Sequence, residues 1–266
     1  MPSFSLKSLK EVKKLSKDAD CHPVAIIKGD ERNPLFNSFL CLHKDSTEGK
    51  QSLNLPPDMM YQQLPNTNPM HRDVTYIAGP SGCGKSTIAK TLTLNYLKLY
   101  PHRKVYLVSN LSKDETLDSI KPPLTRIDID ELIINPPVLE ETEPSLWIFD
   151  DFDSIEKKKL DQLMDFINTI AIQGRHSTTS LIYISHYLTN FKQTRLMLNE
   201  SHYFVLYPQS SSVMGLKYLL QTYIGMDKKD IKTLRQQGRW VCIHSQYPQF
   251  AVSSSNAYLC HSYVDK

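Results

Sequence analysis

The sequence predicts an α/β fold in which helices cover both faces of a mainly parallel central sheet, with an additional C-terminal β-hairpin. Three observations lead to this fold class. From residue 74 onward, short apolar runs recur without polar alternation, helical stretches separate them, and a glycine-rich turn joins the first run to the first helix. Continuous apolar strands are typical of sheets buried on both faces. Strands that alternate with helices favour parallel pairing through right-handed crossovers.

Each element of this core can be placed along the chain. The apolar runs that predict strands are VTYIA (74–78), KVYLVSN (104–110), SLWIFD (145–150), TSLIYIS (179–185) and HYFVLYP (202–208). Between them, helices are predicted over residues 85–99, 113–120, 155–172 and 190–198. Two more helices are predicted over 213–224 and 227–237, the second with Asp227 as N-cap and Gly238 as its stop. The terminal hairpin pairs RWVCIHS (239–245) with FAVSS (250–254).

The first 72 residues differ from this core and predict a lead-in to a domain that covers residues 73–266. Apolar residues at every third position from Leu6 to Leu15, set among lysines, predict a short amphipathic basic helix. Two short strands, 22–30 and 37–44, should follow. A proline-punctuated link over 54–73 should then lead into the core.

Composition bounds the class of protein without choosing a partner. The chain has 266 residues, 40% of them hydrophobic, and a formal net charge of +3, so a nucleic-acid-binding surface would have to be local. Five scattered cysteines without a CxxC pair favour reduced thiols. No targeting segment is visible and no apolar run approaches about 20 residues, so we expect a soluble protein that is made without secretion and has no membrane partner.

GPSGCGKST, residues 79–87, is the strongest chemical signal in the chain. The pattern follows an apolar strand and opens a helix, which is the context of a phosphate-binding P-loop. Glycines let backbone N–H groups curl around phosphate oxygens, Lys85 can reach the β- and γ-phosphates, and Ser86 offers its hydroxyl to Mg²⁺. A P-loop NTPase is therefore predicted. Its nucleotide-binding residues are Gly79, Pro80, Ser81, Gly82, Cys83, Gly84, Lys85, Ser86 and Thr87.

A second acidic motif, LWIFDD, carries an apolar strand up to two adjacent aspartates. Asp150 can hold Mg²⁺ through water, together with Ser86, and Asp151 can orient and polarise an attacking water. Acid pairs at strand ends also occur in ordinary loops, but the P-loop about 65 positions upstream favours the catalytic interpretation. Two adjacent acids favour nucleotide hydrolysis, because a small-molecule kinase needs its second acid aimed at a substrate hydroxyl.

Ser185 and His186 stand at the end of the strand LIYISH. In a P-loop sheet the strand beside the metal-binding strand ends facing the γ-phosphate, so this polar pair can sense whether that phosphate is present. An equal alternative is that the two side chains only cap the next helix.

Arg175 precedes the same strand, at the opposite edge of the sheet from the phosphates if the strand is parallel. It could therefore act only on a neighbour's nucleotide, where an arginine supplied in trans stabilises charge on the transferring phosphoryl group. The alternative is that Arg175 closes the C-terminus of its own helix. Position alone favours that alternative.

Taken together, GPSGCGKST, LWIFDD, GRHSTTSLIYISHY and TRLMLNESHYFVLYP, in this order and spacing, resemble the genome-packaging ATPases of large double-stranded DNA viruses. These proteins form the poxvirus-type branch of the FtsK/HerA superfamily of DNA-pumping motors. The resemblance covers about residues 72–210. Its specific part is the Gly-Arg-His strand with the following stretch from Arg195 to Asn199.

The resemblance implies a role for each matching residue. Lys85 and Ser86 match the Walker A pair, and the two aspartates match the Walker B acids. Many relatives carry glutamine where this chain has His186, which is bulkier and titrates near neutral pH. The family also uses an arginine from an adjacent protomer, and Arg175 or Arg195 could fill that role, with Arg175 preferred. The implied catalytic residues are Lys85, Asp151, Ser185, His186 and Arg175.

The implied function is that of a DNA-translocating motor that packages a viral genome into the capsid. A homo-oligomeric ring would bind ATP and Mg²⁺ between protomers, hydrolyse ATP to ADP and phosphate with stimulation by DNA, and grip double-stranded DNA through its phosphates without sequence specificity. Capsid or portal protein would be a further partner, in the host cytoplasm at viral assembly sites or with the virion. Lysines of the N-terminal helix and Lys228, Lys229 and Lys232 are candidates for the grip, or are solvated surface charges.

Two other classes of function share parts of this pattern. A small-molecule or nucleoside phosphotransferase would have the P-loop and the parallel sheet, but no arginine-rich lid lies between the core strands. A nucleotide-regulated binding protein would bind ATP without hydrolysing it, and the two adjacent aspartates argue against that. ABC-type ATPases have a similar P-loop, yet no LSGGQ-like segment precedes LWIFDD.

Overall fold

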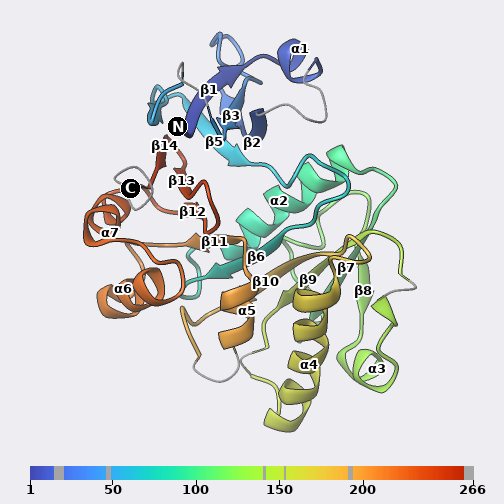
Figure 1. The fold of residues 1–266 in the computed structure, drawn as a ribbon. Helices are drawn as coiled ribbons and strands as arrows, with labels where there is room; N and C mark the ends of the chain where they lie inside the picture. The colour runs from blue at the N-terminus through green and yellow to red at the C-terminus, as the bar shows by residue number, and fades with distance from the viewer. Residues whose placement is uncertain (15–20, 46–48, 140–141, 153, 191–193, 261–266) are drawn as a thin grey trace. The chain divides into compact units, whose positions relative to one another are not determined.

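A computed structural model of the chain describes residues 1–14, 21–45, 49–139, 142–152, 154–190 and 194–260. The chain divides into two compact units (Figure 1), one made of Met1–Asn68 with Leu206–Lys266 and the other of Pro69–Val205. The boundary predicted between residues 72 and 73, with a lead-in before it and an ATPase domain after it, stays a prediction. Within the described ranges, the helices are all too short or too polar to cross a membrane.

The sheet of the Pro69–Val205 unit has the strand order expected of a P-loop protein. Its strands run in the order β11 (Tyr203–Leu206), β6 (Val74–Ala78), β10 (Ser180–Ser185), β9 (Ser145–Asp150), β7 (Lys104–Ser109) and β8 (Thr125–Ile127). From β6 to β8, every neighbouring pair is parallel. The predicted mainly parallel sheet is therefore confirmed.

The register of these strands brings their C-terminal ends to one edge of the sheet. Ser185 of β10 is opposite Ala78 of β6, and Asp150 of β9 is opposite Ser109 of β7. Every residue of β6, β9 and β10 is buried, as the continuous apolar runs predicted. The P-loop and the acid pair thus begin at the same edge.

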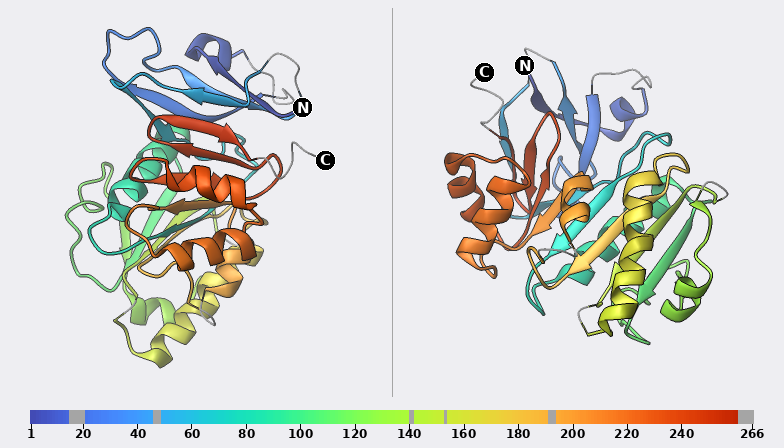
Figure 2. Two further views of the ribbon diagram at one scale, coloured as in Figure 1. Left: turned by 90° about the vertical axis from the view of Figure 1, so that its left-hand side faces the viewer. Right: turned by 60° about the horizontal axis from the view of Figure 1, so that its bottom comes forward.

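Helices cover both faces of this sheet (Figure 2). Helix α2 (Lys85–Leu99) packs on one face, while α4 (Lys157–Gln173) and the short α5 (Arg195–Glu200) pack on the other. Phe166 of α4 lies edge-on against Trp147 and Phe149 of β9, with ring centroids 5.3 and 6.3 Å apart. This aromatic cluster stabilises the strand that ends in the acid pair, because buried aromatic pairs contribute beyond their buried area.

The segment between β7 and β9 differs from the prediction. Residues 113–120 form turns and no helix, because the carboxylate of Asp114 accepts hydrogen bonds from the N–H groups of Thr116 and Leu117 at 2.7 and 2.8 Å and only one helical turn closes. Strand β8 and helix α3 (Ile129–Ile134) were not predicted. The helix predicted over 190–198 begins at Arg195, and residues 191–193 lie outside the described residues.

The other unit contains two groups of antiparallel strands, and the second group pairs strands from the two ends of the chain. One runs β1 (Ser3–Lys7), β3 (Phe39–His43), β2 (Cys21–Gly29) and β5 (Met59–Gln63), and the other β4 (Ser52–Asn54), β14 (Asn256–Leu259), β13 (Phe250–Ser253) and β12 (Val241–His244). The predicted hairpin is confirmed as β12 and β13. The two sheets meet where Phe4 packs edge-on against Phe250, with ring centroids 5.9 Å apart.

The N-terminal segment corrects a prediction. In place of a basic helix from Leu6 to Leu15, residues 3–7 form β1 and only Leu9–Val12 form a helix, α1. Phe4, 1% exposed, is buried by the strand, and this burial outweighs the helical spacing of the leucines. Leu15 lies outside the described residues.

Two C-terminal helices complete this unit, as predicted. Helix α6 covers Val213–Thr222, and α7 covers Lys228–Arg235. The side chain of Asp227 caps α7 by accepting from the N–H of Asp230, as predicted. The helix ends at Arg235 with Gln236 as its C-cap, two residues before the predicted stop at Gly238.

Candidate functional site

The loop between β6 and α2 has the backbone of a phosphate-binding turn. Gly82 and Gly84 have φ angles of 74° and 108°, in the left-handed region that a side chain would strain. Gly84 is also the N-cap of α2 and supplies no side-chain cap, so the N–H groups of the first turn have no such partner. The N–H of Gly79 donates to Ser185 O at 3.2 Å and fixes the start of the loop to β10. Exposed N–H groups at a helix N-terminus favour an anion.

Lys85 lies inside this loop, although it carries a full charge. Its side chain is 7% exposed, and its Nζ donates to the carbonyls of Gly79 and Pro80 at 2.8 and 3.1 Å. Ser86 is half-buried next to it, and Thr87 is exposed. A buried ammonium that is held by backbone carbonyls is positioned for phosphate oxygens that enter the loop.

The acid pair at the end of β9 has two different environments. Asp150 is 6% exposed, and burial, followed by the nearby charges of Asp114 and Asp151, raises its pKa to about 7, while Lys85 acts in the opposite direction. Asp151 is half-buried and has a φ of 62°, a left-handed conformation that aspartate tolerates better than most residues. The site therefore combines three carboxylates with one ammonium, and Asp150 is the buried acid among the three.

His186 lies between the P-loop lysine and the second acid. Its Nδ1 is 3.5 Å from the Nζ of Lys85, and its Nε2 is 3.8 Å from Oδ1 of Asp151. Because an ammonium can only donate, a hydrogen bond at this contact would use Nδ1 as the acceptor, and the other ring nitrogen, Nε2, faces Asp151. The structure thus brings residues from the P-loop, β9 and β10 into one row.

Ser185 is placed differently from its neighbour. It is buried, its carbonyl accepts from Gly79, and its hydroxyl accepts from the N–H of Tyr187 at 3.0 Å. These contacts hold the start of the P-loop and the turn that carries His186. Its predicted direct part in catalysis stays a prediction.

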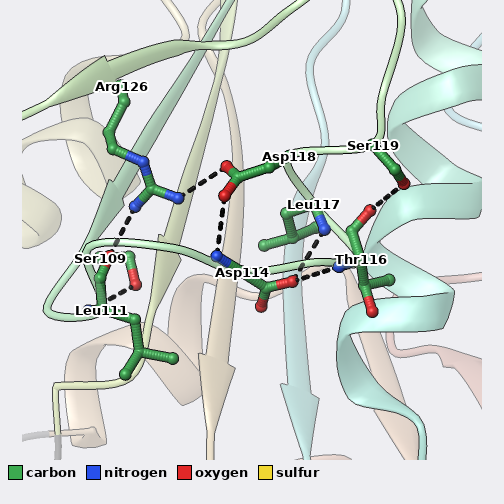
Figure 3. Close-up of polar contacts among 8 residues, drawn as sticks. All are labelled: Ser109, Leu111, Asp114, Thr116, Leu117, Asp118, Ser119 and Arg126. Atoms are coloured by element: carbon green, nitrogen blue, oxygen red, sulfur yellow. Dashed lines mark hydrogen bonds and ion pairs between the residues drawn. The ribbon is translucent and has the colours of Figure 1, made fainter.

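Asp114 is a residue of the site that the sequence reasoning missed. It belongs to the loop after β7, where its carboxylate is fixed by two backbone N–H groups (Figure 3). The same view shows Arg126, which pairs with Asp118 at 2.7 Å and donates to Leu111 O at 2.8 Å. The loop is thereby held at the edge of the sheet where Asp150 lies. The available signal was an aspartate in the first turn of the helix predicted over 113–120, which follows a predicted strand.

The same loop is fixed to the neighbouring elements. Lys90 of α2 donates to the hydroxyl of Ser119 at 2.7 Å, and Asn110 donates to the hydroxyl of Ser154, after β9, at 3.0 Å. The third carboxylate therefore comes from a loop held on two sides.

Arg175 is not part of this cluster. It lies before β10, at the edge of the sheet opposite the P-loop, where its side chain is exposed and its Nε donates to His176 Nε2 at 3.4 Å. The C-terminus of α4 is closed by Arg72, which donates to Ile170 O and Ala171 O at 2.5 and 2.6 Å. The alternative role considered for Arg175 is thus filled by Arg72. Arg195 opens α5 and is also exposed.

A divalent cation fits this donor set as a shared ligand. No group of three or more ligating side chains in the described ranges could hold a metal without help. Mg²⁺ characteristically takes one or two protein oxygens and completes its shell with phosphate oxygens and water. The Asp150 carboxylate and the Ser86 hydroxyl are suited to that role, and a cation there would compensate the excess negative charge.

Comparisons with known proteins give one relative by sequence. No protein-family model matches the chain. Uncharacterized protein V3 of Sputnik virophage is 36% identical over 247 residues, which cover 91% of this chain and 97% of that protein.

Two solved structures share part of the architecture. The genome packaging NTPase B204 of Sulfolobus turreted icosahedral virus 2, in complex with sulfate, matches with a TM-score of 0.48 and 14% identity over 68% of this chain and 94% of that one. The cytoplasmic domain of the type VII secretion ATPase EccC of Thermomonospora curvata matches with a TM-score of 0.49 and 13% identity over 87% of this chain and 28% of that one.

Proposed function

The chain belongs to the same family as uncharacterized protein V3 of Sputnik virophage, and we propose that it is an ATP-hydrolysing motor that moves double-stranded DNA during the packaging of a viral genome. The observation that supports ATP hydrolysis is the position of His186 between Lys85 and Asp151, at the sheet edge where the P-loop and the two aspartates lie. The motifs GPSGCGKST, LWIFDD and GRHSTTSLIYISHY, with their resemblance to packaging ATPases, support the DNA substrate.

In this proposal, the P-loop residues bind and orient ATP. The backbone N–H groups of the loop cradle the phosphates, and Lys85 exchanges its two carbonyl partners for β- and γ-phosphate oxygens. Asp151 accepts a hydrogen bond from the attacking water and aims it at the γ-phosphorus. The water oxygen bonds to the γ-phosphorus as the bond from that phosphorus to its bridging oxygen breaks. One proton of the water stays on the phosphate, the other is released to solvent, and ADP and phosphate leave.

Ser86 and Asp150 would hold Mg²⁺, Asp150 through a water molecule. When bound, the ion neutralises charge on the β- and γ-phosphate oxygens. Asp150 is buried with a raised pKa, so a nearby cation would favour its ionised form. Asp114 is not one of the two proposed ligands, but its negative charge near Asp150 would strengthen the binding of the cation.

His186 would report whether the γ-phosphate is present. It lies 3.5 Å from the ammonium that binds that phosphate and directly follows β10. When Lys85 changes partners, the imidazole loses or regains its acceptor contact, and the turn after β10 can move with it. Loss of the γ-phosphate is a known way to release a switch segment.

The proposal includes a homo-oligomeric ring. The exposed Arg175 lies at the opposite edge of its own sheet from the P-loop, so it would act on the nucleotide of an adjacent protomer. DNA would be held by its phosphates without sequence specificity. Capsid or portal protein is proposed as a further partner, at assembly sites in the host cytoplasm or in the virion, with residues 73–266 as the ATPase domain.

The test is the rate of ATP hydrolysis with and without a linear DNA duplex of arbitrary sequence. The wild-type protein should hydrolyse ATP and be stimulated by the duplex. The Lys85→Ala variant should lose both rates, because the ammonium that binds the γ-phosphate is gone. Lys98→Ala removes an exposed charge from the last turn of the same helix and should leave both rates unchanged.

Two outcomes would contradict the proposal. Turnover that ignores the duplex, with phosphate appearing on a small acceptor, would indicate a phosphotransferase. Tight ATP binding without turnover would indicate a nucleotide-regulated binding protein.

A further inference from the structure

A basic groove lies between α6 and α7, apart from the residues assigned to hydrolysis. It has a volume of about 540 Å³ and is lined by Lys217, Lys228, Ile231, Lys232, Arg235 and Gln236. The four cationic side chains and the glutamine are exposed, and only Ile231, at the base of the groove, is buried. A pocket for a small organic ligand is usually lined mainly by apolar side chains, and this groove is not.

Three of the cations form a row on one face of α7. Lys228, Lys232 and Arg235 are four and three residues apart, so they project within a narrow arc of the helix. Lys217 of α6 adds the fourth charge from the other wall. Lys229 lies about 100° around the helix from Lys228 and does not line the groove.

No carboxylate neutralises this row among the residues that line the groove. The two acids of the same region are used elsewhere. Asp227 accepts a hydrogen bond from the N–H of Asp230 at 2.7 Å and caps α7, and Asp230 is fully buried on the inner side of the helix. None of the four cations forms an ion pair with another described residue. The groove therefore presents four unpaired positive charges around one concave surface.

We propose that this basic groove binds the phosphate backbone of double-stranded DNA. Along α7 the row from Lys228 to Arg235 spans about 10 Å, and a duplex strand presents a phosphate about every 3.4 Å along its axis. Because the strand also winds around that axis, a row of this length can contact more than one phosphate of a strand, whereas a single phosphate group would use one or two of the cations. The inference rests on the proposed function for its choice of duplex DNA among polyanions, and it specifies which surface holds the DNA.

The experiment measures binding of a fluorescent 30-base-pair duplex at several salt concentrations. The groove variant is K228Q/K232Q/R235Q, and the matched control K50Q/K98Q/K121Q removes the same charge from exposed lysines outside the groove. The groove variant should bind the duplex about tenfold or more weakly, and the slope of log affinity against log salt should fall by about 2 to 3. The control should stay within about twofold of wild type, and both variants should keep the wild-type rate of ATP hydrolysis without DNA.

A variant that fails to fold is identified by circular dichroism, in which case the single variants K228Q and K232Q replace it. Equal loss of affinity in the groove and control variants would overturn the inference, because net charge would then explain binding. If the wild-type protein binds the duplex and the groove variant binds it with the same affinity, the inference about the groove is wrong, but the proposed motor function is not affected. Wild-type protein that binds no duplex would contradict both. Binding of labelled ATP is also measured in Lys85→Ala proteins with and without the groove substitutions. If ATP binding that remains in Lys85→Ala is lost when the groove is substituted, the groove is a nucleotide site and the inference is wrong.

Discussion

The imidazole of His186 contacts a cation through one nitrogen and faces a carboxylate with the other. A glutamine side chain offers the same pair of polar groups, an acceptor oxygen for the ammonium and N–H donors for the acid. This equivalence gives a physical reason why relatives with glutamine at this position could work in the same way. Leucine offers neither group.

The first prediction concerns this residue. His186→Gln should keep most of the DNA-stimulated ATPase rate, whereas His186→Leu should lower it by about tenfold to a hundredfold with little effect on ATP affinity, because only the γ-phosphate contact is lost. Steady-state kinetics with a fluorescent-nucleotide binding assay separates the two quantities. Equal rates in the wild-type and leucine proteins would remove His186 from the proposed mechanism.

Asp150 gives a prediction about pH. Its pKa is raised by burial to about 7, while an aspartate in the unfolded chain titrates near about 4. Between these two values the folded protein holds a proton that the unfolded chain has lost, so the free energy of unfolding should fall as pH rises through this window. Denaturant unfolding in EDTA without nucleotide, at pH 5 and pH 8, measures the effect.

The matched variant for this prediction is Asp150→Asn, which has no charge to bury. It should be more stable than wild type by up to about 4 kcal/mol at pH 8 and by about 1 kcal/mol at pH 5, while losing ATP hydrolysis. A variant that is less stable than wild type at pH 8 would show that the buried carboxylate is already compensated.

The sequence predicted the motif residues of the site, since each stands at a strand end or a glycine turn that a single strand–helix unit defines. Asp114 was missed because its relation to Asp150 depends on the path of a loop of some fifteen residues after β7, which no periodicity describes. The direct role predicted for Ser185 stays a prediction, and its hydrogen bond from the N–H of Tyr187 is a local contact that its position in the sequence does not reveal.

At the scale of the helices and strands, close packing at the end of α4 explains why the Gly-Arg-His stretch has a glycine at position 174. A Cβ on Gly174 would lie 2.6 Å from Ile170 O, 2.8 Å from a guanidinium nitrogen of Arg72 and 3.0 Å from Thr179 O. Two of these atoms belong to the backbone, and the third belongs to the arginine that holds the last carbonyls of the helix. A Cβ at this position would therefore force these groups at the end of α4 to shift.

Gly174→Ala should therefore destabilise the protein by about 1 to 3 kcal/mol, as overpacking usually does. Gly238→Ala is the matched control, because its Cβ would meet only the Ser254 hydroxyl at 3.2 Å. Chemical denaturation followed by circular dichroism compares the two. Equal stability of both variants would contradict the close packing at the end of α4.

Element prediction succeeded where local pattern and burial agree. Helix α2 and strands β6 and β9 have the predicted bounds, because a glycine turn or an acid pair marks their ends. It failed for the helix predicted from Leu6 to Leu15. There β1 pairs with β3, a strand more than 30 positions away, and this pairing buries Phe4. Strand β5 was read as part of a proline-rich link for the same reason.

At the scale of the whole molecule, the chain ends fold together while the middle forms its own unit. Sequence order suggested an N-terminal lead-in followed by one continuous domain. The structure pairs β4 with β14, so that residues about two hundred positions apart form one sheet. Such non-local pairing leaves no signal in a single sequence, since each strand looks the same whichever partner it has.

The trans role of Arg175 is a prediction at this scale. Arg175→Ala and Lys85→Ala proteins should each be nearly inactive, but a mixture should regain a measurable part of the ATPase rate, because a Lys85→Ala subunit still supplies its arginine to a neighbour. A mixture of Arg195→Ala with Lys85→Ala should regain nothing beyond the activity of Arg195→Ala itself. If only the Arg195 mixture recovers, the arginine has been assigned to the wrong residue.

The central claim is that ATP hydrolysis by this protein moves double-stranded DNA, and displacement of a third strand from a DNA triplex tests it most directly. Wild-type protein with ATP and Mg²⁺ should release the labelled third strand, and it should not do so with a non-hydrolysable ATP analogue or with the Lys85→Ala variant. DNA-stimulated ATP hydrolysis without release of the third strand would contradict the account.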